Sequence, residues 1–129
     1  MRNLADIMAE EQEFVFATPA VLLRAAELVE QGWTQGQDAC LSNGTPCTYS
    51  NDEAVRWCAN GAIYRSAYER WGDRYNESTI EADAACMAMK KAVLAAALQS
   101  ITEWNDVKGR TAGEVAAKLR EAAAGISGP

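Results

Sequence analysis

Four stretches of this chain carry apolar residues at helical spacing, and residues that start or end helices flank them. In the clearest stretch, residues 18–31, Thr18 is placed to cap a helix, Pro19 takes its first position and Gly32 ends it. The other stretches are residues 52–71, 79–103 and 111–124. Amphipathic helices bury their apolar faces by packing on one another. The pattern therefore predicts an all-α fold, a single-domain bundle of about four main helices.

Local signals set the expected ends of the later helices. The second helix is expected to start at Asn51 or Asp52 and to stop at Gly72. Residues 78–81 and 111–114 have the composition of capping boxes, which mark the starts of the next two helices. A glycine inside a helix costs about 1 kcal/mol relative to alanine. The close approach of another backbone would explain such a glycine. Gly61 in the second helix therefore predicts a close contact with another helix.

The segment between the first two helices has the signals of a short β-hairpin at residues 40–49. Asn43 and Gly44 form the strongest two-residue turn signal, and such a turn would place Cys40 opposite Cys47. Leu41 would then lie opposite Pro46. An irregular surface loop is the alternative interpretation.

With 129 residues the chain fits one domain, residues 1–129, in which residues 1–17 form an N-terminal extension and residues 18–124 the helical core. In the extension, residues 4–8 suit a short helix and residues 14–16 suit an extended piece. The expected core contains larger apolar residues of the predicted helices: Leu22, Val29, Trp33, Cys58, Ile63, Leu94, Leu98, Ile101, Trp104, Val115 and Leu119.

Charge and hydropathy exclude several classes of partner. No apolar run approaches the roughly 20 residues of a membrane-spanning helix, and no apolar signal core follows Arg2. We therefore expect a cytoplasmic protein. The net charge of −6 lacks the basic footprint of a nucleic-acid binder. Acids outnumber bases in residues 1–31, which is typical of a solvated helix face; an acidic mimic of nucleic acid is the alternative.

The chain contains no histidine, which removes Ser–His and Cys–His nucleophilic catalysis. Its four cysteines, at positions 40, 47, 58 and 86, lie too far apart for the closely spaced pairs of a structural zinc site. No phosphate-binding glycine loop is present, because no lysine follows Gly36. The sequence therefore predicts no metal, no cofactor and no catalytic residues, and it favours a non-enzymatic protein.

Two short polar motifs are the candidate ligand-binding site. Residues 32–36, Gly-Trp-Thr-Gln-Gly, offer a stacking face at Trp33 and an amide at Gln35. Residues 104–106, Trp-Asn-Asp, offer Asn105 and Asp106 close in sequence to Arg110. In the alternative interpretation both motifs are structural: Trp33 and Trp104 pack into the core, and Arg110 pairs with Asp106.

The two motifs, together with Cys58–Ala59–Asn60–Gly61–Ala62 and Gly109–Arg110–Thr111, resemble a family of small uncharacterised proteins of actinobacteria and their phages. That family is a domain of unknown function, and the resemblance covers residues 18–124. It implies a fold and a phage or actinobacterial setting, which for a phage protein means the host cytoplasm. It implies no mechanism.

Two functional hypotheses follow. The first is a non-enzymatic accessory protein that binds a host protein partner, without nucleic acid or membrane. The second is a small-ligand binder or enzyme with a site formed by Trp33, Gln35, Asn105, Asp106 and Arg110. The sequence leaves open whether copies of the chain associate.

Overall fold

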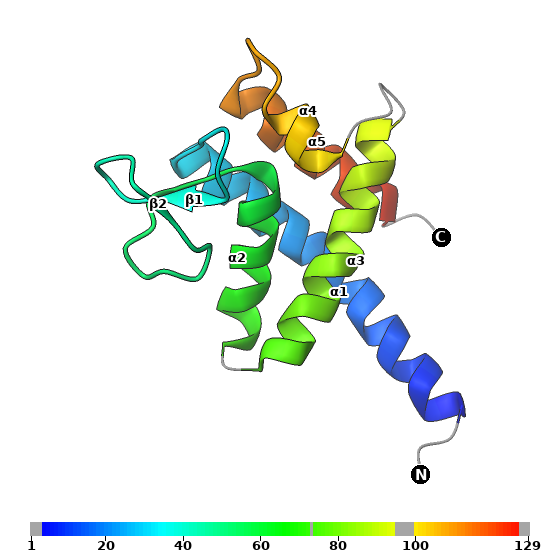
Figure 1. The fold of residues 1–129 in the computed structure, drawn as a ribbon. Coiled ribbons are helices and arrows are strands. Elements are labelled where there is room, and N and C mark those ends of the chain that lie inside the picture. Colours follow the sequence, from blue (N-terminus) through cyan, green and yellow to red (C-terminus); the bar gives the residue numbers. More distant parts are fainter. Residues whose placement is uncertain (1–3, 73, 95–99, 127–129) are drawn as a thin grey trace.

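One long helix, α1 (Leu4–Gln31), is the element on which the other long helices pack. In the computed structural model, which describes residues 4–72, 74–94 and 100–126, it contacts α2 (Ala59–Trp71), α3 (Tyr75–Leu94) and α5 (Ala112–Ile126). Figure 1 shows α2 and α3 as neighbouring helices in front of α1. The short α4 (Ile101–Asn105) and α5 lie near the C-terminal end of α3. The prediction of a mostly helical fold is confirmed, and a small antiparallel sheet accompanies the helices.

The core lies where these helices meet. Residues of α1 at helical spacing, among them Leu22, Ala25 and Val29, are fully buried. Most of the predicted core residues are buried: Leu22, Val29, Cys58, Ile63, Ile101, Trp104, Val115 and Leu119. Trp33 is only half-buried against this core. Leu94 and Leu98, also expected in the core, have side chains outside the described part of the chain.

The predicted start of the first helix at Thr18 is wrong. α1 begins at Leu4 and passes through Pro19, so residues 14–16 are helical and not extended. Inside a helix a proline removes one backbone hydrogen bond, and its ring crowds the carbonyl four residues earlier, at a cost of about 3 kcal/mol. Neither effect prevents a helix from continuing when packing holds the turns on the C-terminal side, as it does here at Val21 and Leu22. Thr18 is itself 2% exposed, so it occupies a packed position and not a helix start.

A three-stranded antiparallel sheet of order β2-β1-β3 lies at one end of the molecule (Figure 1). Its strands are β1 (Ala39–Cys40), β2 (Pro46–Cys47) and β3 (Arg56–Trp57). The predicted hairpin exists, but its register is shifted by one residue: Ala39 pairs with Cys47, and Cys40 with Pro46. All four cysteines are free thiols.

The register differs because the hairpin loop has three residues instead of two. The Leu41 carbonyl accepts from Gly44 N, and Leu41 N donates to Thr45 O, both at 2.9 Å. A two-residue turn of the expected type needs positive φ at both Asn43 and Gly44. Among the described residues only glycines have positive φ, and Gly44, at 87°, is one of them. The chain therefore forms a turn with a single left-handed glycine.

The second helix starts later than predicted, at Ala59 instead of near residue 52. The preceding residues form β3, and Trp57 N donates to Gly32 O at 3.1 Å. Val55, an apolar residue inside the predicted helical stretch, is 41% exposed. Cys58 caps α2, because its Sγ accepts from Gly61 N at 3.2 Å. The predicted end at Gly72 is confirmed. Residues 56 and 57 pair with β1, which lies far from them in sequence. They therefore form a strand and not the helical turn that was predicted.

The third predicted helix, residues 79–103, is wrong at both ends. α3 starts at Tyr75, so residues 78–81 lie inside it and form no capping box. Glu81 is fully buried and pairs with Arg70 Nε at 2.9 Å, while burial raises its pKa. A separate helix, α4, follows the cap at Ser100.

The last helix agrees with the prediction to within two residues, and the Thr111 hydroxyl accepts from Glu114 N at 3.2 Å, as a capping box requires.

Gly61 lies at a close backbone contact, although its neighbour is a loop and not the predicted helix. A Cβ built on Gly61 would lie 2.0 Å from the carbonyl oxygen of Asp38. The same carbonyl accepts from Cys58 N at 3.1 Å, which holds the segment before β1 against the start of α2.

We expect Gly61→Ala to lower the free energy of unfolding by about 1–3 kcal/mol, because the contacted atoms belong to the backbone and must shift as a unit. Gly113→Ala is the matched control in α5, since its nearest neighbour would lie 3.9 Å away. Denaturant midpoints measure both. A Gly61→Ala variant as stable as the Gly113→Ala variant would contradict the close contact.

Candidate functional site

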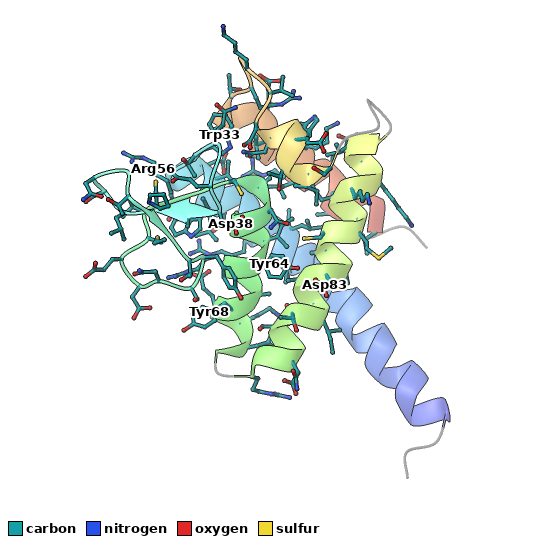
Figure 2. All side chains as sticks on the ribbon, viewed as in Figure 1. Trp33, Asp38, Arg56, Tyr64, Tyr68 and Asp83 are labelled. Atoms are coloured by element: carbon teal, nitrogen blue, oxygen red, sulfur yellow. The ribbon has the colours of Figure 1, made fainter. Side chains whose placement is uncertain are left out.

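The two motifs singled out in the sequence meet at the end of α1. Trp33 Nε1 donates to Asn105 Oδ1 at 2.8 Å, and Gln35 Nε2 donates to the backbone oxygens of Asn105 and Val107 at 3.0 and 3.1 Å. Figure 2 places Trp33 beside the turn that joins α4 to α5. Residues about 70 positions apart in sequence therefore form one polar cluster, as the ligand-site hypothesis requires.

Asn105 is the centre of this cluster and is fully buried. Its Oδ1 accepts from Trp33 Nε1 and from the backbone N–H of Ala59, the latter at 3.0 Å. Its Nδ2 donates to Thr34 O at 3.2 Å and to Asp106 Oδ1 at 2.9 Å. One amide thus links the end of α1, the start of α2 and the end of α4.

Asp106 and Arg110 complete the cluster with different partners. Asp106 Oδ1 accepts from Gly36 N at 3.0 Å. Arg110 donates to the carbonyl of Trp104 at 3.0 Å, lies over its ring at 4.1 Å from the centroid, and pairs with Glu114 at 3.1 Å. The expected pairing of Arg110 with Asp106 is therefore wrong. The Arg110 guanidinium instead links Trp104, near the end of α4, to Glu114 in the first turn of α5.

These contacts engage the amide nitrogens of Gln35 and Asn105 and one carboxylate oxygen of Asp106. The amides of Gln35 and Asn105 already donate to protein oxygens, and Asp106 already accepts twice. A ligand at this place would have to displace several of those bonds. The geometry suits a clamp between three helix ends.

Three other side chains that could act as nucleophiles or acids, those of Cys58, Cys86 and Tyr64, are held in their neutral forms. Burial raises the pKa of the Cys58 thiol to about 11 and that of Cys86 to about 12. The Tyr64 hydroxyl donates to Asp83 at 2.5 Å across α2 and α3, and this bond raises the Tyr64 pKa above its usual range (Figure 2). Among the described residues no group of histidine, cysteine or carboxylate side chains could hold a metal ion.

An open groove that sequence reasoning missed lies between α1, α3 and α5. It has a volume of about 550 Å³, and we call it the α1–α3–α5 groove. Small residues make up much of its lining, with longer side chains beside them: Ala84, Met87, Ala88, Lys91, Ala122 and Gly125. Met87 is 65% exposed. The sequence offered one signal, a run of alanines along α3, but helical spacing alone does not tell a buried alanine from one that lines a groove.

Comparison with known proteins identifies a family but no activity. A family model described as a family of unknown function, DUF6197, matches residues 16–125. No curated protein and no solved structure is significantly similar to the chain. The prediction of a domain of unknown function is confirmed at this level. No described helix has the combination of length and apolar character needed to cross a membrane.

Proposed function

Since the chain belongs to DUF6197, a family of unknown function, we propose its role from its own geometry: it is a non-enzymatic protein that takes a helix of a partner protein into the α1–α3–α5 groove. We further propose a phage or actinobacterial setting, in which the partner is a host protein in the cytoplasm. The groove is the observation that carries the proposal.

The lining of the groove favours a helix as its ligand. Ala84, Ala88 and Gly125 are small, so a partner backbone can approach closely. Met87 is unbranched and adapts its shape to different apolar side chains. An amphipathic helix laid in an apolar groove is a common mode of protein recognition. A partner helix would also cover Met87, which is otherwise largely exposed to solvent.

Protein binding also agrees with the state of the polar cluster around Asn105. Its amides and carboxylate are hydrogen-bonded within the chain, and the buried thiols of Cys58 and Cys86 stay protonated near neutral pH. The described part of the chain thus offers apolar surface for recognition, whereas its polar groups stabilise the fold.

Capture of partners by two matched variants tests this function. Met87→Glu places a charge in the groove, and we expect it to lose at least about nine-tenths of the partner that the unmodified chain captures from host lysate, a tenfold or greater loss of affinity. Leu23→Glu is the control, because Leu23 is also an exposed apolar residue of a helix, at 45%, but does not line the groove.

Equal capture by the two variants would overturn the groove as the binding site. Loss of capture in Gln35→Ala, with Met87→Glu unaffected, would instead place the binding site at the polar cluster. Thermal melts of each variant identify any loss that comes from unfolding.

A further inference from the structure

The first turns of α1 and the α1–α3–α5 groove lie next to one another. Residues 4–17, which we call the N-terminal arm, form the first turns of α1 and extend beyond the other helices (Figure 1). Thr18, where the arm meets the packed part of α1, lines the α1–α3–α5 groove. The arm leaves the body at the groove and points away from it, so it lies where a neighbouring molecule can take it up.

The sequence of the arm is that of a helix that needs a partner. Leu4, Ile7 and Met8 recur three and four positions apart, and Val15 continues the same helical period. A helix of this length is marginally stable in water unless an apolar face is covered. The family match starts at residue 16, so the arm lies almost entirely outside the shared domain.

Charge points to the same occupant. The arm carries Asp6, Glu10, Glu11 and Glu13 and no basic residue. The groove presents Lys91, whereas Lys90, the preceding residue of α3, lines a separate pocket on the other side of Met87; both lysine side chains are exposed. Neither lysine forms an ion pair with another described residue, whereas Glu121 of the groove pairs with Lys118 at 2.7 Å. An acidic amphipathic helix is therefore the complementary ligand.

We propose that the N-terminal arm of a second copy occupies the groove, in a reciprocal dimer that keeps the groove closed until a partner helix displaces it. The proposal rests on the proposed function, because it regulates the same groove. In a two-fold exchange, one type of contact, arm in groove, forms twice. The arm acts as a competitor that sets how tightly a partner must bind.

Measurement of molar mass by light scattering on the full chain tests the exchange. We expect a dimer, and we expect Ile7→Glu in the arm and Met87→Glu in the groove each to halve the mass at the same concentration. Lys91→Glu should raise the dissociation constant at least about tenfold, and added salt should weaken the unmodified dimer. Leu23→Glu should remain dimeric.

Mixing the two monomeric variants gives the sharpest result. The Ile7→Glu chain keeps an intact groove and the Met87→Glu chain keeps an intact arm, so a mixed dimer retains one of the two contacts. We expect an equimolar mixture to regain part of the dimer mass that neither variant shows alone. Circular dichroism confirms that each variant is folded.

A monomeric unmodified chain, or a dimer that survives both substitutions, would overturn the exchange. These outcomes are distinct from failure of the proposed function. If the chain is monomeric and Met87→Glu still loses the partner, the groove binds partners without regulation by the arm. If the dimer depends on Met87 and partner capture does not, the groove serves self-association only.

Discussion

Replacing Trp104 by alanine is expected to lower the free energy of unfolding by about 3–5 kcal/mol, the usual cost of removing a buried tryptophan. Trp104 is 4% exposed and lies on α4, where the chain turns toward α5. Its ring also supports the Arg110 guanidinium at 4.1 Å. The loss would be a large share of the 5–15 kcal/mol that stabilises a typical domain.

Chemical denaturation measures this loss, and Trp104→Phe is the control. Phenylalanine keeps most of the apolar volume and a face for Arg110, so we expect a clearly smaller decrease. The competing interpretation makes Trp104 an exposed platform for a ligand. Under that interpretation Trp104→Ala would leave the denaturation midpoint unchanged, which the observed burial argues against.

Replacing Asn105 by alanine is expected to cost about 2–5 kcal/mol, because the Ala59 N–H and the Trp33 Nε1–H both lose their acceptor. Each unsatisfied buried donor costs about 1–3 kcal/mol, and the half-buried indole recovers part of this by contact with water. Two measurements should show the effect. The free energy of unfolding should decrease, and the amide protons at the start of α2 should exchange faster.

Gln35→Ala and Asn105→Asp are the comparisons for this experiment. Gln35 is exposed, so losing its two hydrogen bonds should cost about 1 kcal/mol or less. In Asn105→Asp, burial and the neighbouring Asp106 would raise the pKa of the introduced carboxyl in the folded state. Its protonated form is then favoured by folding, so the variant should recover stability at low pH and lose it as the pH rises through that folded-state pKa.

If Asn105→Ala were as stable as the unmodified chain, the hydrogen bonds around Asn105 would not hold the helix ends together. The polar cluster would then be free to rearrange around a ligand. In that case the small-ligand hypothesis would gain support over protein binding through the groove.

The sequence by itself determined where most helices stop at their C-terminal ends and many of the positions that they bury. The stop at Gly72 and the capping box at Thr111 are made by residues within one turn of each other, so a local reading suffices. The buried positions Leu22, Val29, Ile63 and Leu119 follow from helical periodicity, which is also a property of neighbouring residues. The ligand-site hypothesis grouped Trp33, Gln35 and Asn105, but no local rule placed these residues together; their contacts come from the tertiary structure.

Only the tertiary structure decided the features that depend on partners far along the chain. β3 replaces a predicted helical turn because β1 pairs with it, and the carbonyl of Asp38 explains Gly61. The bonds that Asn105 forms with Trp33, Thr34 and Ala59 were likewise fixed by three helix ends that meet in space. The groove beside Met87 exists because α1, α3 and α5 meet without filling the space between them. Such contacts join segments that no periodicity or capping rule relates to one another, because those rules act within a few residues. Tertiary packing, in contrast, depends on residues from anywhere in the chain.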